Sequence, residues 1–187
     1  MHLLALLLLT AVTGATPAPK EGATRPPENL LAGPARCVLR YLDAVRLAGP
    51  RTGGVRPGRP PTPNEREYAL AKQLTAPRTL EEIGRWAARG ADHPLAPWRD
   101  AARARVLDSF QLLAARRAPR GAAIVTVKER YWLADPDAAL ERAVSEYLVA
   151  RVNGEWKVID RRPGGAFEDD VVAEAYEGFF DVPPPSR

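Results

Sequence analysis

The chain of 187 residues contains one cysteine and two histidines, and these shortages exclude several kinds of chemistry. A single cysteine cannot form an intrachain disulfide, so we expect Cys37 to be a buried thiol rather than a nucleophile. His93 stands beside Pro94, where we expect a capped turn histidine. With so few histidines, Ser-His and Cys-His catalysis and multi-histidine metal sites lack their residues. The sequence therefore predicts neither a metal site nor a cofactor.

Other binding motifs are missing as well. Glu168-Asp169-Asp170 lacks the spacing of a calcium-binding loop, and we expect it to be the solvated start of a helix. Gly164-Gly165 is an isolated pair and not a phosphate-binding loop. Arginine outnumbers lysine by 23 to 4 and the net charge is +4, but the positive charge lies in residues 20–120, and residues 121–187, which include most of the candidate strands, are acidic overall. We therefore expect no nucleic-acid partner.

The first 19 residues carry no charged side chain. An apolar stretch from Leu3 to Val12 leads into the small residues Thr13-Gly14-Ala15, which is typical of a secretory signal peptide. The stretch is shorter than the roughly 20 residues of a membrane-spanning helix. We predict a cleaved signal peptide over residues 1–15, no stable membrane span, and a secreted or periplasmic protein. The proline-rich residues 16–33 are expected to be a disordered tether.

Residues 34–49 have the pattern of an amphipathic helix. Val38, Tyr41, Leu42 and Val45 recur at helical spacing, and Gly49 marks the end of the pattern. A loop rich in proline, glycine and arginine follows over residues 50–63 and is expected to be flexible. Two short helices come next, each with a predicted capping box, and the pairs are Thr62 with Glu65 and Thr79 with Glu82.

The pattern changes to strands after residue 105. Four candidate strands cover residues 106–118, 122–133, 140–152 and 155–162. The first two flank Pro119-Arg120-Gly121, and the last two flank Asn153-Gly154, which is a strong hairpin signal. The sequence thus predicts an α+β protein with helices on a curved, mainly antiparallel sheet of four or more strands, partly covered on both faces. Residues 166–180 form one more short helix or an edge segment, and residues 183–187 are expected to fray.

This order of elements, together with "YLDAVRLAG" from Tyr41 to Gly49 and "VNGEWKVID" from Val152 to Asp160, resembles the NTF2-like (SnoaL-like) α+β superfamily. The resemblance covers residues 34–182 and implies a single domain in which the sheet wraps the first helix as a cone. Some members of that superfamily are isomerases, dehydratases or cyclases that use a pocket in the cone. Many others are non-catalytic binding or accessory domains, including secreted ones.

By analogy with the isomerases of that superfamily, Tyr41 falls where an oxyanion-stabilising tyrosine would lie. Such chemistry also needs a carboxylate, for which Asp108 is the main candidate, with Glu129 and Glu146 on later strands. The acidic residue usual after the first helix of the family is replaced by Pro50-Arg51. Packing of Tyr41 in the helix core is the alternative interpretation.

The aromatic residues of the predicted cone are candidates for lining a ligand pocket, and they are Tyr41, Trp98, Tyr131, Trp132 and Tyr147. Ordinary core packing competes with this interpretation. Our leading hypothesis is a secreted or periplasmic, non-catalytic binding or accessory domain, whose partner is an unknown protein or a small apolar ligand. The alternative is a small-molecule enzyme using Tyr41 and a carboxylate. A homodimer formed through the sheet is compatible with both.

The predicted signal peptide can be tested on protein recovered from the cells that make it. Mass spectrometry of the N-terminal peptide should find no Met1 and a first residue near position 16, because cleavage follows small residues. A variant with Leu7→Arg and Leu8→Arg should keep Met1, since charge in the apolar stretch prevents export. Recovery of intact Met1 from the unchanged chain would contradict the prediction.

Overall fold

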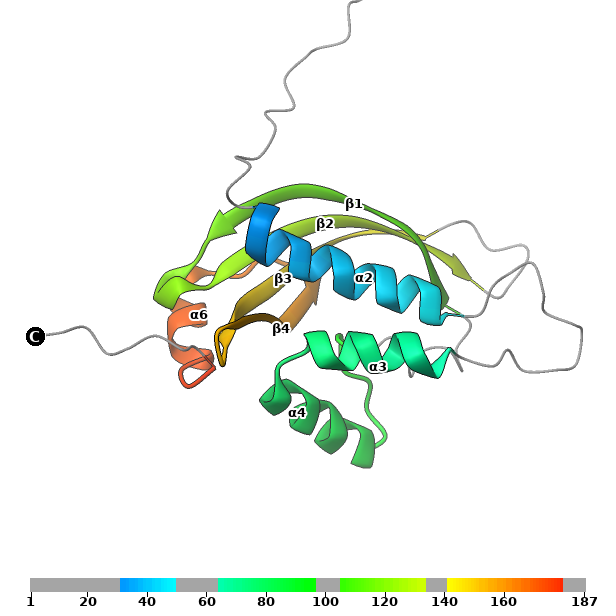
Figure 1. The fold of residues 1–187 in the computed structure, drawn as a ribbon, viewed down its shortest axis with the longest axis horizontal. Helices are drawn as coiled ribbons and strands as arrows, with labels where there is room; N and C mark the ends of the chain where they lie inside the picture. The colour runs from blue at the N-terminus through cyan, green and yellow to red at the C-terminus, as the bar shows by residue number, and fades with distance from the viewer. Residues whose placement is uncertain (1–30, 50–63, 97–104, 134–140, 180–187) are drawn as a thin grey trace, which may run out of the picture.

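The computed structural model describes residues 31–49, 64–96, 105–133 and 141–179 (Figure 1). At five positions it describes the backbone alone, namely Leu31, Ala32, Arg105, Trp132 and Leu133. The predicted signal peptide, most of the predicted tether, the loop 50–63 and the tail 183–187 lie outside the described residues. The last residues of the predicted tether, from Leu31, belong to the short helical turn η1 (Leu31–Ala35).

Helix α2 (Arg36–Ala48) is the predicted amphipathic helix, and it lies across the concave face of the sheet (Figure 1). It ends at Gly49, whose N–H donates to the carbonyl of Val45 at 3.1 Å. Because apolar residues recur every three or four positions, one side of the helix is buried. The buried residues are Cys37, Val38, Tyr41, Leu42, Ala44, Val45 and Ala48.

Helices α3 (Glu65–Leu74) and α4 (Pro77–Ala88) follow α2, and the capping box predicted for α4 is wrong. Neither helix has a side-chain cap hydrogen bond. Helix α4 begins at Pro77, so Thr79 lies inside its first turn and donates its hydroxyl to the carbonyl of Ile159 at 2.8 Å. The hydroxyl of Thr79 thus bonds to a strand of the sheet and does not cap its own helix. Thr62 lies outside the described residues.

The four predicted strands form one antiparallel sheet in the order β1-β2-β3-β4. The strands are β1 (Arg105–Arg117), β2 (Ala123–Leu133), β3 (Glu141–Val152) and β4 (Glu155–Pro163). Residues Pro119–Gly121 form the short helical turn η3 between β1 and β2. Between β3 and β4, Asn153 and Gly154 have φ values of 53° and 78°. Two successive positive φ values are what a two-residue type I′ hairpin requires, so this sequence signal is confirmed.

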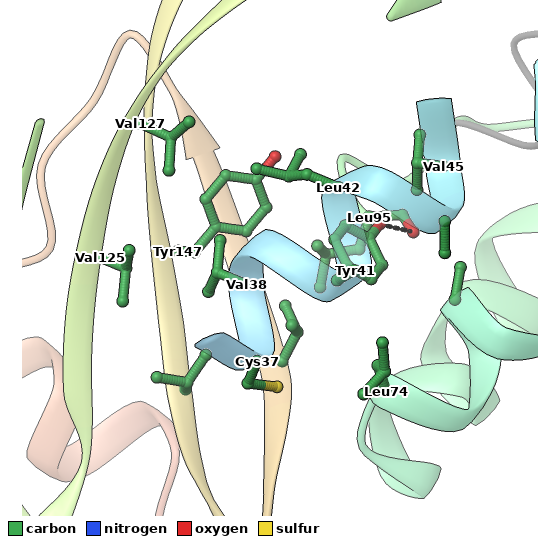
Figure 2. Close-up of a cluster of buried hydrophobic side chains, with 14 of the residues drawn as sticks. Cys37, Val38, Tyr41, Leu42, Val45, Leu74, Leu95, Val125, Val127 and Tyr147 are labelled. Carbon is green, nitrogen blue, oxygen red and sulfur yellow. Dashed lines mark hydrogen bonds between the residues drawn. The ribbon is translucent and has the colours of Figure 1, made fainter. Parts of the chain in front are cut away.

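Both faces of the sheet carry buried apolar residues. On the concave face, Val125, Val127, Tyr147 and Val149 pack against the buried side of α2 (Figure 2). On the other face, Ile124 and Leu148 belong to a second cluster, which also holds Ala76, Ala122, Ala150, Ile159, Phe167 and Val172. Because adjacent strand residues point to opposite faces, two clusters are needed to bury them.

Helix α6 (Asp169–Ala175) contributes to the second cluster through Val172 and closes one end of the sheet (Figure 1). Its start at Asp169 places acidic side chains in the first turn, where the helix dipole favours them. The segment 166–180, for which the sequence left two choices, therefore contains a short helix. Within the described residues, none of the helices has the length and apolar character needed to cross a membrane.

The described residues thus form an α+β fold in which four α-helices accompany one curved antiparallel sheet. The tight β3–β4 turn gives a direct test of this arrangement. Gly154→Ala should destabilise the protein by about 1–2 kcal/mol, because an alanine at φ near 78° is strained. Urea denaturation followed by circular dichroism measures the change.

Gly84→Ala is the matched control for that variant. A Cβ built at Gly84 or Gly154 meets open space, but Gly84 lies inside α4 without a positive φ. Alanine at position 84 should therefore stabilise the protein by up to about 1 kcal/mol through its higher helix propensity. If Gly154→Ala is as stable as the unchanged protein, or more stable, the turn is not held in the described conformation.

Candidate functional site

Polar side chains gather on the concave face of the sheet, where apolar packing would be expected. Glu129 and Tyr131 are two residues apart on β2, and Ser145 and Tyr147 are two apart on β3, so each pair shares a face. Arg161 of β4 lies opposite Tyr147 in the strand register. We call these five residues the buried polar cluster. Each is at most 9 % exposed, and Glu129 is 0 % exposed.

The carboxylate of Glu129 is the centre of the buried polar cluster. Its Oε2 accepts hydrogen bonds from the hydroxyl of Tyr131 at 3.0 Å, the hydroxyl of Ser145 at 2.7 Å and Nη2 of Arg161 at 2.6 Å. Its Oε1 accepts a hydrogen bond from the hydroxyl of Tyr147. Two of the donors come from β3, so this strand connects the two charged residues. The carboxylate is fully engaged by the protein itself.

Arg161 is held from several directions as well. Its Nη2 also donates to the hydroxyl of Tyr131 at 2.8 Å, and its Nη1 donates to the carbonyl of Pro94 at 3.1 Å. Its Nε is buried and has no hydrogen-bond partner among the described residues. Burial by itself lowers the pKa of Arg161, but its neighbours Tyr147 and Glu129 outweigh burial and raise the pKa overall. The guanidinium therefore stays charged and paired with Glu129.

Tyr41 lies beside the buried polar cluster, but its hydroxyl points to a different partner. It donates to the carbonyl of Leu95 at 3.1 Å, the bond drawn in Figure 2. The ring of Tyr41 is tilted by 60° against the ring of Tyr147, with 6.1 Å between the ring centres. Burial raises the pKa of both tyrosines above the ordinary value, and the charge of Glu129 raises it further. Both phenols are therefore neutral side chains of the core.

Of the other residues named from the sequence, Asp108 is not in this cluster. Asp108 lies on β1 with a side chain 31 % exposed, where it accepts a hydrogen bond from Ser109 at 3.0 Å and pairs with Arg130 at 3.8 Å. The carboxylate that lies among the tyrosines is Glu129. Trp98 lies outside the described residues, and only the backbone of Trp132 is described.

Cys37 is buried, as the sequence analysis expects, and its thiol donates to the carbonyl of Trp156 at 3.1 Å. Burial raises the pKa of the thiol to about 11, so the reactive thiolate is scarce at neutral pH. Across the four described segments, no group of three His, Cys, Asp or Glu side chains is arranged to hold a metal ion.

A groove of about 590 Å³ runs along the outer edge of β4, and we call it the β4 groove. It lies between α4 and the residues around the end of α6. Its lining includes Trp86, His93, Asp160, Arg162, Tyr176 and Phe179. Arg161 also reaches this groove, so the groove adjoins the buried polar cluster. It is a concave surface of the size that small ligands occupy.

His93 is fixed in one state at the wall of the β4 groove. Its Nδ1 accepts a hydrogen bond from the N–H of Leu95 at 3.1 Å, as expected for a capped turn histidine. Burial lowers the pKa of His93, although the nearby carboxylates of Asp160 and Glu82 act in the opposite direction. The ring is therefore neutral at pH 7, with its proton on Nε2, which makes Nε2 a hydrogen-bond donor.

A second groove, of about 420 Å³, lies at the start of α2 beside the β3–β4 hairpin, and we call it the α2 groove. Arg36, Arg40 and Lys157 give it a basic rim. Lys157 is already engaged, because its Nζ donates to the carbonyl of Gln73 at 2.8 Å and pairs with Glu155 at 2.7 Å.

No family model, curated protein or solved structure matches the chain. The candidate site is therefore described by its own geometry. Of the residues named from the sequence, the structure brings together Tyr41, Glu129, Tyr131 and Tyr147. It adds Ser145, Arg161 and Trp86, which sequence reasoning missed, and it places His93, expected as a capped turn histidine, at the wall of the β4 groove. For the members of the buried polar cluster on β2 and β3, the available sequence signal was that polar residues stand two positions apart on each strand.

The Glu129–Arg161 ion pair predicts a large effect of a small change. Glu129→Gln keeps the size of the side chain but leaves the buried guanidinium of Arg161 without a counter-charge. We expect a loss of about 3–5 kcal/mol in the free energy of unfolding, measured by urea denaturation.

Glu155→Gln is the control, because Glu155 is 74 % exposed and its ion pair with Lys157 is at the surface. Its loss should be below about 1 kcal/mol. The double variant Glu129→Gln, Arg161→Met should lose less than the sum of the two single variants, since it leaves no unpaired charge. A Glu129→Gln variant as stable as the control would show that water reaches the ion pair.

Proposed function

We propose that this protein is a secreted or periplasmic, non-catalytic binding or accessory domain of NTF2-like fold. The main support is the engagement of Glu129, which accepts four hydrogen bonds and is 0 % exposed. A general base or acid must reach a proton of the substrate. In the concave face, where enzymes of that superfamily hold their catalytic groups, this carboxylate is occupied by the protein itself.

Tyr41 supports the same proposal. An oxyanion-stabilising tyrosine has to direct its hydroxyl at the substrate, but the hydroxyl of Tyr41 donates to the carbonyl of Leu95. Recruiting Tyr41 for catalysis would break this bond and leave a buried carbonyl without its donor, which costs about 1–3 kcal/mol. The arrangement favours the core-packing role of Tyr41 over the enzyme alternative.

The fold part of the proposal is supported by the order and placement of the elements. A first helix lies on the concave face of an antiparallel meander, and two shorter helices follow it in sequence. This is the order that the resemblance of "YLDAVRLAG" and "VNGEWKVID" to the superfamily implies. Export is supported by the apolar stretch from Leu3 to Val12.

A fragment screen followed by NMR tests the proposal. With the isotope-labelled full chain, we expect ligands to shift the amide signals of residues that line surface grooves. The amide signals of Val127, Ser145 and Tyr147 should stay unchanged, because their side chains are buried in a filled core. No ligand should be converted into a product.

The enzyme alternative makes the opposite forecast. A ligand that shifts the signals of Val127, Ser145 and Tyr147 and is chemically converted would overturn the proposal. Loss of that conversion in Tyr41→Phe, with full activity in Tyr68→Phe as control, would assign the chemistry to Tyr41. Both tyrosines are buried helix residues, so the two substitutions are matched in kind.

A further inference from the structure

The β4 groove has an aromatic wall on each side. On the α4 side, Trp86 and His93 meet edge to face, with ring centres 5.1 Å apart. On the other side, Tyr176 and Phe179 make a second edge-to-face pair at 5.8 Å. Trp86 is 36 % exposed, which is high for a large aromatic side chain. Rings on both sides of a groove favour a ligand with flat faces.

The charges that line the β4 groove balance each other. Two carboxylates, Glu82 and Asp160, face two guanidinium groups, Arg161 and Arg162, and His93 is neutral at pH 7. Just behind the lining, Glu129 pairs with Arg161 and adds a negative charge, and Arg78, whose guanidinium lies 4.9 Å from the ring centre of Phe179, adds a positive one. The groove therefore has no net charge with which to select an anion or a cation, although it holds both donors and acceptors of hydrogen bonds.

Some of the polar side chains that line the β4 groove already make hydrogen bonds within the protein. Asp160 accepts hydrogen bonds from the hydroxyl of Tyr176 and from the N–H of Arg161. Arg162 donates to the carbonyl of Ala166 at 3.1 Å, and its guanidinium lies 4.5 Å from the ring centre of Phe167. Donors and acceptors that are held in place by such bonds are suited to fixing the orientation of a small ligand.

An extended peptide is a poor occupant of the β4 groove, because the edge of β4 is blocked. The carbonyl of Val158 accepts from the N–H of Ala76 at 2.9 Å, and the carbonyl of Ile159 accepts from Thr79. The N–H of Arg161 donates to the side chain of Asp160 at 2.6 Å, and Pro163 has no N–H. An added strand would find these main-chain groups taken.

We propose that the β4 groove binds a neutral small molecule built on a ring whose face can stack on aromatic side chains, with hydrogen-bonding groups around the edge of the ring. The ring packs between the Trp86–His93 and Tyr176–Phe179 walls, and its polar edge faces Asp160, Arg162 and Nε2 of His93. Pyranose sugars and heteroaromatic rings share this chemistry. The inference rests on the proposed binding function and names its ligand class.

NMR titration of the full chain tests the inference, with two arms that separate the two sources of such rings. One arm uses N-acetylglucosamine and cellobiose, and the other uses adenosine and cytidine. Benzoate and benzamidine are the charged ring controls. We expect members of one neutral arm to shift the amide signals of Trp86, Asp160 and Tyr176 in a saturable way, and to bind more tightly than both charged rings.

Trp86→Ala should weaken that binding roughly tenfold, the usual scale for removing one stacking partner. Trp86 is partly exposed, so the variant should remain folded. Leu113→Ala is the control, because Leu113 is another exposed large apolar side chain, 44 % exposed, on β1. It should leave the dissociation constant unchanged.

The inference is overturned if no neutral ring binds, if benzoate or benzamidine binds more tightly, or if Trp86→Ala leaves the affinity unchanged. Binding confined to the α2 groove would also refute it while leaving the proposed binding function intact. Ligands that enter the buried polar cluster and are converted would instead overturn the proposed function. The two failures are therefore distinguishable.

Discussion

The carboxylate of Glu129 and the guanidinium of Arg161 meet inside the protein, and much of the structure depends on this ion pair. The two residues belong to β2 and β4, and β3 lies between these strands. A buried charge is tolerated only when it is paired and hydrogen-bonded. A slip of β2 by one residue would turn Glu129 to the other face and leave Arg161 unpaired. The pair therefore favours one register across three strands.

The same ion pair also connects the sheet to the segment that walls the β4 groove. Arg161 donates to the carbonyl of Pro94, and Tyr41 donates to the carbonyl of Leu95. Two neighbouring carbonyls are thus held from the sheet and from α2. His93 precedes them and is fixed by its own bond to the N–H of Leu95. The hydrogen bonds of the buried interior therefore also fix the position of His93 in the aromatic wall of the β4 groove.

The strands and turns could be predicted from the sequence because the patterns that indicate them are local. Alternation over short runs, together with Asn153-Gly154, predicts β3 and β4 almost to the residue. The capping of α4 was not accessible, since Thr79 has two possible partners and the sequence shows only the local one. Its hydroxyl donates to Ile159, which is distant in the sequence and becomes a neighbour only once the sheet is folded. Tertiary context outweighed the local pattern there.

The composition of the buried polar cluster could be predicted only in part. Glu129 was among the candidate carboxylates, and Tyr131 and Tyr147 were candidate pocket residues. Whether these side chains meet depends on the register between the strands. The place of Arg161 among them depends on an irregularity in that register. The register of β3 and β4 shifts between Leu148 and Val149. Without that shift, the pairing of Val149 with Val158 would continue to Tyr147 opposite Asp160.

An acidic side chain would then lie on the concave face, next to Glu129, and two unpaired carboxylates would share a buried site. The observed shift instead places Arg161 opposite Tyr147 and Asp160 opposite Leu148. Directly paired residues share a face of the sheet, so Asp160 lies on the face that carries Tyr176. One inserted residue in β4 thus decides which of two adjacent, oppositely charged residues faces the interior. One charge completes the interior, the other anchors the second wall of the β4 groove, and both sides of the groove are fixed from consecutive positions of one strand.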